Sequence, residues 1–335
     1  MTCGSGRKPM QGFLCTLLIA AAVAVTQTGE CQSAEAIRLA VQKTGTFSWE
    51  LAVIRAHGLD KEAGLTLEVR ELANAEAGKV ALRAGDTDII ISDFLWVSRE
   101  RTLGASLTFY PYSSALGGVM VPNASTIKTA ADLRGRKLAV AGGPIDKNWL
   151  ILQAALKRQN IDLRQEATIV YGAPPLLAAA MLNGEADATV TYWNFGALLE
   201  GKGFRRVTSV QDLARSFGAK GPVAMLGYVF DESWGQANHA GLARFIEMTR
   251  KAKEILATSD SEWDTISSLT GGPDETALKV YRDRYREGIP RRTVSEEEAD
   301  ARILYRVLAD IGGHDIVGPA DELAPGTFFH QLGGE

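Results

Sequence analysis

The sequence predicts an α/β fold built from two similar lobes. Short apolar runs typical of buried strands alternate with segments of helical periodicity, and the same pattern returns 99 residues further along. Strands separated by single helices form right-handed βαβ units, so each half is expected to hold a parallel sheet. Two apolar, glycine-containing segments, at 115–121 and 224–230, are expected to cross from one lobe to the other and back.

The elements of the first half follow from its hydrophobic periodicity. We expect strands at 37–42, 65–71 and 88–92, with helices at 49–61 and 75–84 between them.

A repeat supports the second half. Residues 39–41 (Leu-Ala-Val) recur at 138–140, and 82–92 match 181–191 at the same offset. A period of this length is too long for a solenoid repeat and suits paired lobes.

The last third of the chain reads as helical. We expect helices at 241–258, 262–269, 275–286 and 295–311. Ser295 and Glu298 fit a capping box, with Ser295 as the N-cap. These helices are expected to pack back onto the first lobe, which would make that lobe discontinuous in sequence.

Residues 1–36 are typical of an export signal. A basic pair, Arg7-Lys8, precedes an apolar run at 12–25, which is shorter than the roughly 20 residues that a spanning helix needs. Ala34-Glu35-Ala36 then supplies small residues for cleavage after Ala36, with cleavage after Ala34 as an alternative. An uncleaved anchor is the competing interpretation, and the exported chain is expected in the periplasm.

Composition excludes several classes of protein. The three cysteines, Cys3, Cys15 and Cys31, all lie in the export signal, so the secreted chain has no thiol for disulfides, nucleophilic catalysis or metal binding. A net charge of −4 argues against a general nucleic-acid binder, which normally carries a basic excess.

The candidate site lies in loops. In open parallel sheets ligands bind beyond the carboxyl ends of the strands, and aromatic rings beside hydroxyls and backbone donors suit a small organic ligand. The loops at these positions contribute Thr46, Phe47, Trp49, Ser92, Asp93 and Trp96 from the first half, and Gly143, Asp146, Asn148, Tyr171, Tyr192, Trp193 and Asn194 from the second.

Each candidate also has a structural interpretation. Any one tryptophan could pack behind its sheet, and Asp93 and Asp146 could cap helices instead of facing a ligand. The Gly142-Gly143 turn could offer backbone N–H groups to an anion, but it matches neither a Walker loop nor a dinucleotide fingerprint.

Two segments resemble nitrate/taurine-type solute-binding proteins of ABC importers. Residues 132–140 (Asp-Leu-Arg-Gly-Arg-Lys-Leu-Ala-Val) are similar to the segment that enters the second lobe in that family. Residues 174–188, followed by Tyr192-Trp193, are similar to its helix and strand before a ligand-facing loop. With Gly85-Asp86-Thr-Asp88, the resemblance covers about residues 37–260.

The resemblance implies a type II periplasmic-binding fold: two βαβ-rich lobes, joined by two crossing segments, with a ligand cleft between them. It implies a monomer without a cofactor that captures a small solute and delivers it to a membrane permease with its ATPase. Family members carry sulfonates, nitrate, bicarbonate, aromatic carboxylates or pyrimidine precursors of thiamine. The expected division is a signal peptide at 1–36, the first lobe at 37–118 and 226–335, and the second lobe at 119–225.

The crossing segments are expected to form the hinge of this fold. Gly117, Gly118 and Gly227 lie in them and can absorb a change in backbone dihedral angles.

Two residues depart from the family pattern. Asp93 stands where many relatives have small neutral residues, and Asp146 lies in a loop that relatives often use for an oxyanion. These carboxylates would oppose an anion unless Lys43 and Lys147 offset them, so a zwitterionic, cationic or neutral aromatic solute stays open.

No enzyme is expected. The histidines form no metal-binding motif, and no Gly-x-Ser-x-Gly elbow is present. The competing function is a periplasmic sensor that signals to a membrane receptor.

Overall fold

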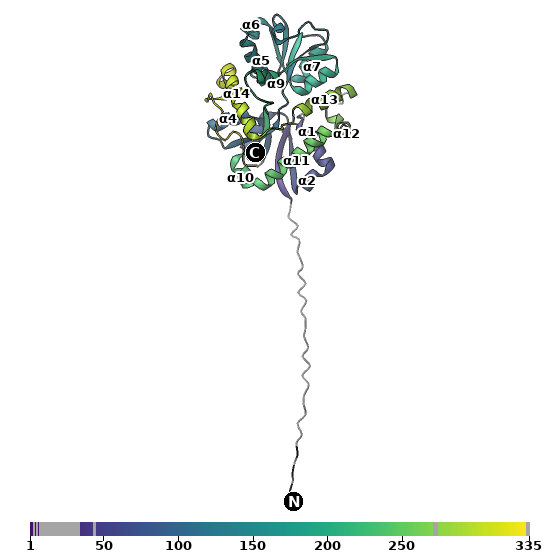
Figure 1. Ribbon diagram of the computed structural model, residues 1–335, viewed down its shortest axis with the longest axis vertical. Helices are drawn as coiled ribbons and strands as arrows, with labels where there is room; N and C mark the ends of the chain where they lie inside the picture. The colour runs from purple at the N-terminus through teal and green to yellow at the C-terminus, as the bar shows by residue number, and fades with distance from the viewer. Residues whose placement is uncertain (3, 5, 7–33, 43–44, 271–273, 333–335) are drawn as a thin grey trace. The chain divides into compact units, whose positions relative to one another are not determined.

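The computed structural model describes residues 1, 2, 4, 6, 34–42, 45–270 and 274–332 (Figure 1). Contacts divide the chain into Met1–Ser33 and Ala34–Glu335, and the helices and strands of the described residues lie in the second unit. Most of the expected export signal, and Lys43, lie outside the described residues.

The elements follow one another in a regular alternation that extends to the last third of the chain. Up to the first crossing they are β1 (Glu35–Gln42), α1 (Phe47–His57), α2 (Leu59–Glu62), β2 (Leu65–Leu72), α3 (Ala75–Arg83), β3 (Ile89–Asp93), α4 (Phe94–Thr102) and β4 (Leu107–Ser113). Next come β5 (Gly118–Pro122), η1 (Ala130–Leu133), β6 (Lys137–Ala141), α5 (Lys147–Lys157), α6 (Leu163–Glu166), β7 (Thr168–Gly172), α7 (Pro174–Leu182), β8 (Ala188–Thr191), α8 (Trp193–Gly201), β9 (Phe204–Ser209) and α9 (Val210–Ser216). The chain ends with β10 (Leu226–Asp231), α10 (Glu232–Ala237), α11 (His239–Thr258), α12 (Ser261–Thr265), η2 (Ser267–Thr270), α13 (Glu275–Glu287), α14 (Val294–Gly312) and α15 (His314–Val317).

The strands form two sheets of the same design. Sheet A has the order β2-β1-β3-β10-β4, and sheet B has the order β7-β6-β8-β5-β9. In each sheet the three strands of the βαβαβ unit run parallel, and the strand that follows a crossing runs antiparallel to its neighbours. The repeat therefore corresponds to two equivalent lobes, one around each sheet, as the sequence predicts.

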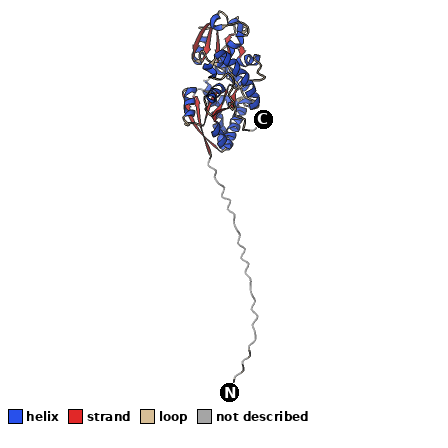
Figure 2. Cartoon of the chain, turned by 90° about the vertical axis from the view of Figure 1, so that its left-hand side faces the viewer, coloured by secondary structure: helices blue, strands red, loops and turns tan. Residues whose placement is uncertain are grey.

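Burial differs between the central strands and the edge strands β2 and β7. All four residues of β8 are buried, and β6 is buried except at Lys137, as expected of parallel strands covered on both faces. The outer strands β2 and β7 are largely exposed or half-buried. Helices lie around both sheets (Figure 2).

The crossing glycines are required by close packing. A Cβ on Gly117 would lie 1.9 Å from the carbonyl oxygen of Thr191, and one on Gly227 would lie 2.2 Å from the ring of Phe109. Neither glycine has a positive φ. Tight contact between strands, more than a special backbone conformation, therefore excludes a side chain at these positions.

The C-terminal helices contact both lobes. α11 packs against α1 of the first lobe, whereas α13 lies against α8 and α14 against α5 of the second lobe. Gly201 allows the approach of α13, because a Cβ there would lie 2.5 Å from that of Ala277.

The capping box of α14 differs from the predicted one. Thr293 is the N-cap, its side chain accepting from the backbone N–H of Glu296, and the Glu296 carboxylate accepts from the backbone N–H of Thr293. The predicted pair, Ser295 and Glu298, lies two residues further on. Both pairs fit the same sequence pattern, so the pattern alone could not separate them.

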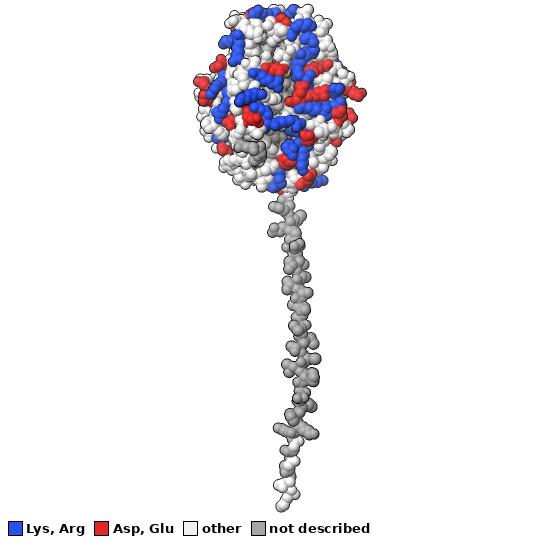
Figure 3. Space-filling view, in the orientation of Figure 1, with Lys and Arg blue, Asp and Glu red and all other residues white. Residues whose placement is uncertain are grey.

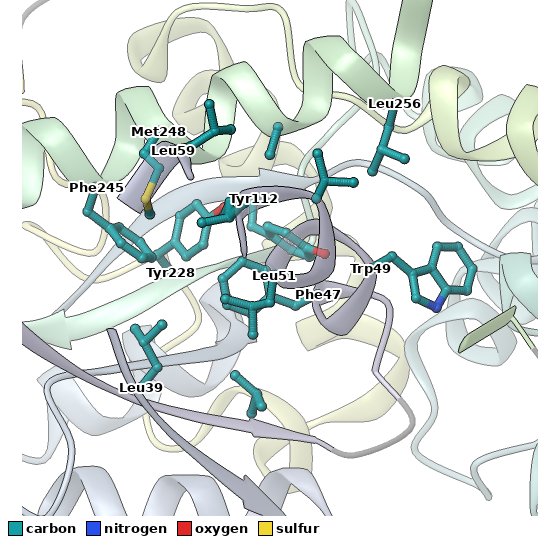
Figure 4. Packing of buried hydrophobic residues seen from close by; sticks show 14 of the residues in the cluster. Leu39, Phe47, Trp49, Leu51, Leu59, Tyr112, Tyr228, Phe245, Met248 and Leu256 are labelled. Carbon is teal, nitrogen blue, oxygen red and sulfur yellow. The ribbon is translucent and has the colours of Figure 1, made fainter. Parts of the chain in front are cut away.

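The hydrophobic cores extend across the lobe boundary. One cluster joins Phe47 and Trp49 to Ala197 of α8, and another joins Phe94 to Leu150 of α5. Figure 4 shows Phe47 near the rings of Tyr112 and Tyr228, with Trp49 apart from these three rings. The lobes therefore share packed interfaces in this arrangement.

On the face drawn in Figure 3, acidic and basic side chains are interspersed. Among the described residues, no helix combines the length and the apolar character needed to span a membrane.

The first strand bears on the two cleavage positions. Glu35 pairs with Leu65 in the β1–β2 ladder and accepts a 2.6 Å hydrogen bond from Arg244. Cleavage after Ala36 would remove two residues of β1, whereas cleavage after Ala34 would leave the strand complete.

Candidate ligand-binding site

The predicted site residues gather where strands of the two sheets end. β1 and β3 lead into the first turns of α1 and α4, and β6 and β8 lead into those of α5 and α8. Thr46, Asp93, Asp146 and Tyr192 are the N-cap residues of these four helices. The strand-end rule therefore placed most candidates at helix starts near the lobe boundary.

Trp49 and Trp193 contact each other across this boundary. Their ring centroids lie 5.7 Å apart in an edge-to-face arrangement. Trp49 is buried, its indole N–H donates to the carbonyl of Leu269 over 3.2 Å, and Trp193 is half-buried. Tyr281 and Tyr285 of α13 lie against both tryptophans.

Phe47 and Thr46 face the interior of the first lobe. The Phe47 ring lies edge-on to Tyr112 at 5.6 Å and to Tyr228 at 5.8 Å (Figure 4). The Thr46 hydroxyl is 3.5 Å from that of Tyr112. In this arrangement both residues therefore support α1 from inside the lobe.

Asp93 both caps a helix and faces the other lobe. One carboxylate oxygen accepts from the backbone N–H of Trp96 over 2.9 Å, and the other lies 3.2 Å from the ammonium of Lys147 in α5. Burial disfavours the charged carboxylate, but Lys147, Lys79 and the Trp96 N–H together lower the pKa of Asp93. Chiefly the charge of Asp93 raises the pKa of Lys147.

Ser92 and Trp96 flank Asp93 and are buried. The Trp96 ring lies beneath the Lys79 ammonium, 5.2 Å from it, and beside the Arg83 guanidinium. Trp96 therefore packs against helix α3 of its own lobe.

Asp146 organises the loop before α5. Its carboxylate accepts from the backbone N–H groups of Asn148 and Trp149 and from the Asn148 amide. Burial raises the pKa of Asp146, although these bonds and Lys147 oppose the shift. The Tyr192 hydroxyl also bonds to Asp146, and burial together with this carboxylate raises the pKa of Tyr192.

The two glycines of this loop are needed for their backbone conformation and, at Gly142, for a close contact. Both Gly142 and Gly143 have positive φ, 85° and 112°. A Cβ on Gly142 would also lie 2.5 Å from the Tyr192 hydroxyl, so only glycine fits there. Asn148, at the start of α5, accepts a 2.9 Å hydrogen bond from the backbone N–H of Gly117, which ties the helix to the first crossing.

The two remaining candidates are Tyr171 and Asn194 of the second lobe. Tyr171 is 40% exposed at the end of the outer strand β7, and Asn194 is half-buried in the first turn of α8. No described contact joins either of them to the cross-lobe pairs.

A buried polar network around Glu50 of α1 was not predicted from the sequence. The carboxylate of Glu50 pairs with the ammonium of Lys253 and accepts a 2.8 Å hydrogen bond from the Tyr285 hydroxyl. Lys253 also lies 4.1 Å from the centre of the Tyr112 ring. Glutamate and lysine within apolar helical stretches were the available signal, but they lie 203 residues apart in sequence.

Two surface pockets of the described residues lie away from the candidate site. The described part of the chain holds no group of three or more metal-ligating side chains. A pocket of about 290 Å³ lies beside Arg158 and Phe217, and one of about 500 Å³ lies beside Arg101 and Pro325.

The family follows from a match over most of the chain. A sequence model described as NMT1/THI5 like matches residues 51–260. The chain belongs to the NMT1/THI5-like family. This confirms the resemblance stated from residues 132–140 and 174–193. Among curated proteins, no sequence matches this family member.

Solved structures confirm the periplasmic-binding fold of this NMT1/THI5-like chain. The periplasmic aliphatic sulphonate binding protein SsuA from Escherichia coli has a TM-score of 0.68 at 18% identity, over 89% of this chain and 98% of that one. The alkanesulfonate-binding SsuA from Xanthomonas axonopodis pv. citri, bound to MOPS, has a TM-score of 0.64 at 17% identity, over 88% and 98%. At such identity the likeness establishes the fold and not the ligand.

An enzyme shares this fold as well. The desulfurization enzyme DszB has a TM-score of 0.53 at 14% identity, over 88% of this chain and 97% of that chain. The fold therefore does not decide between binding and catalysis, and the site must carry that argument.

Proposed function

We propose that the chain is the periplasmic solute-binding component of an ABC importer. It would capture a small organic solute between its lobes and deliver it to a membrane permease with its ATPase. The observation that carries this proposal is the meeting of strand-end residues from both sheets, Trp49 with Trp193 and Asp93 with Lys147. Family membership and the sulfonate-binding SsuA proteins of the same fold support it.

Closure follows from where the binding groups lie. A solute between the lobes gains contacts from both only when they are together, so binding shifts the population toward the closed form. The proposed ligand-binding set keeps the predicted residues: Thr46, Phe47, Trp49, Ser92, Asp93, Trp96, Gly143, Asp146, Asn148, Tyr171, Tyr192, Trp193 and Asn194.

The proposed hinge lies in the two crossings, near the lobe boundaries at 118/119 and 225/226. The amide of Gln211 donates to the carbonyls of Ser114 and Val223, the residues directly before the two crossings. In α14, Glu297 accepts from the backbone N–H of Ala224 in the return crossing, and Asp300 accepts from those of Lys220 and Gly221 shortly before it. These bonds give the crossings a common anchor about which the lobes can turn.

A solute panel tests the proposal. Sulfonates, nitrate, aromatic acids, amines and pyrimidines are titrated into the secreted chain, and binding is read by tryptophan fluorescence and thermal shift. A saturable change in both signals is the expected result, since Trp49 and Trp193 lie at the site. If folded protein binds no member of any class, solute binding is contradicted.

A further inference from the structure

Two contacts of different chemistry cross the lobe boundary. The Asp93–Lys147 ion pair joins the end of β3 to the start of α5, and the Trp49–Trp193 contact joins α1 to the start of α8. β1 lies beside β3 and β6 beside β8, so the two contacts arise from neighbouring strands in each sheet. A solute held there meets a charged pair and an aromatic pair. The class of solute inferred from them rests on the proposed function.

The charged groups at the boundary do not balance. Among the described residues, Asp93 and Asp146 supply two carboxylates against the one ammonium of Lys147, a sum of −1. Lys79 also acts on Asp93, but it pairs with Glu76 over 2.8 Å and so adds no net charge. Among the described residues, a positively charged ligand group would balance this sum, whereas a negatively charged one would add to it.

The position of that charge is set by Asp93. Its side chain is only 12% exposed, and a buried carboxylate needs a charged or hydrogen-bonded partner. One oxygen is fixed by the Trp96 N–H, while the other takes its partner from the opposite lobe. When the lobes part, Lys147 leaves with α5, and this oxygen is the one open to a ligand.

Lys147 has a second carboxylate within reach. Asp146 precedes it directly and contributes to its electrostatic environment. If a ligand cation took the place of Lys147 at Asp93, Lys147 could pair with Asp146, and both carboxylates would be neutralised. An anionic ligand would instead add a third negative group.

We propose that the solute is an organic monocation with an apolar, aromatic part. Its ammonium or amidinium group replaces Lys147 at Asp93, and its ring lies against Trp49 and Trp193. Asp93 thereby acts as the specificity-determining residue, and this chain differs in ligand charge from the sulfonate-binding proteins that share its fold.

A matched trio of probes tests the charge. Phenethylamine, phenethyl alcohol and phenethylsulfonate share the same phenethyl group and differ in the charge of the terminal group. Calorimetric titration of the secreted chain is expected to give an affinity for the amine at least about tenfold above that for the alcohol. The sulfonate is expected to bind more weakly than the alcohol.

Two variants separate recognition from structure. Asp93→Asn retains a capping side chain and is expected to weaken amine binding by about 30-fold or more, leaving the alcohol within about threefold. Lys147→Met removes the internal competitor for Asp93 and is expected to strengthen amine binding severalfold. Loss of a merely structural ion pair would not produce opposite effects at its two ends.

Matched controls come from similar positions. Asp231→Asn alters an aspartate that caps α10 after strand β10, and Lys157→Met alters an exposed lysine further along α5. Neither is expected to change the preference among the three probes.

The results that would overturn the inference are distinct from failure of the proposed function. Tighter binding of the sulfonate than of the alcohol leaves solute binding standing and overturns the cation preference. So does an Asp93→Asn chain that binds the amine as the wild type does, or a Lys147→Met chain that binds it more weakly. If no solute of any charge binds, the proposed function fails and the inference fails with it.

Discussion

Trp193 is the residue whose role is most directly testable. It lies at the start of α8, half-buried, with its ring against Trp49 and two tyrosines of α13. Because a central aromatic ring contributes a large share of a binding energy, Trp193→Ala is expected to weaken binding of a solute found in the panel by at least about tenfold. Calorimetry of both chains against that solute checks this.

The control for Trp193 is a tryptophan away from the boundary. Trp234→Phe alters a ring of α10 that contacts Phe230, and its affinity is expected to stay unchanged. An unaltered dissociation constant in Trp193→Ala would make that tryptophan a packing residue only.

We expect Glu297 to make the stability of the fold depend on pH. It is buried in α14, where it accepts a hydrogen bond from the Ala224 N–H, and burial raises the pKa of Glu297 from 4.5 to about 7 against the opposing effect of that bond and of Arg292. Asp300 and Glu296 also face it and raise the pKa further.

The direction of this pH dependence follows from the number of protons that the folded and unfolded chains bind. Between pH 4.5 and about 7 the folded chain keeps a proton on Glu297 that the unfolded chain releases. Rising pH therefore removes stability, by up to about 3 kcal/mol for this shift. Glu297→Gln keeps the hydrogen-bond acceptor but does not titrate. Its free energy of unfolding relative to that of the wild type is therefore expected to increase from about pH 5 to about pH 8, a range that brackets the shift.

Chemical denaturation of both chains at each pH measures that difference. Glu322→Gln, an exposed substitution, serves as the control and should follow the wild type. Parallel stability profiles for wild type and Glu297→Gln would contradict the account of Glu297.

At the scale of elements, helices α8 and α13 approach each other closely at Gly201. A Cβ on Gly201 would lie 2.5 Å from the Cβ and 2.6 Å from the Cα of Ala277, so the helices would have to separate. Gly201→Ala is expected to destabilise the fold by about 1–3 kcal/mol, as overpacking does. Thermal or chemical unfolding measures the loss.

Gly196 is a matched control on the same helix. A Cβ there meets only the Met120 side chain, at 3.5 Å, which is ordinary contact. Gly196→Ala should be neutral or stabilising, because alanine favours a helix. Equal destabilisation by both substitutions would show that the close approach to α13 is not the cause.

Much of each βαβαβ unit could be predicted from its sequence. The apolar runs at 39–41 and 89–90 are continuously buried, and such strands can be recognised from the sequence. β4 and β9 were not predicted, since Pro111 interrupts one and every residue of the other is half-buried. The partners of α13 and α14 could not be predicted either, because an amphipathic helix shows which face it buries but not against what.

The candidate site, too, could be predicted only in part. The strand-end rule brought Asp93, Asp146 and Trp193 to one region, since it depends only on topology. The choice of Lys147 as the partner of Asp93, and of α13 as the cover over Trp49, depends on how the lobes meet. Residues 54 apart in sequence carry no local signal of such a pair.

At the scale of the whole molecule, packing between the lobes limits how they can move apart. Both large hydrophobic clusters contain residues from the two lobes, and ion pairs such as Arg284–Glu200 and Lys202–Asp274 fasten α13 to the second lobe. Opening must therefore separate packed surfaces or carry α13 along with the second lobe. Under the proposed function, a solute that contacts both lobes would add to this packing and further favour the form in which the lobes are together.

The most direct test measures the distance between the lobes. The chain has no cysteine after residue 31, so Val80→Cys on α3 and Leu176→Cys on α7, 67% and 66% exposed, can carry spin labels, one on each lobe. With a solute that calorimetry shows to be bound, the account predicts a shift of the label–label distances to shorter values and a narrower distribution. An identical distribution with and without that solute would contradict capture by lobe closure.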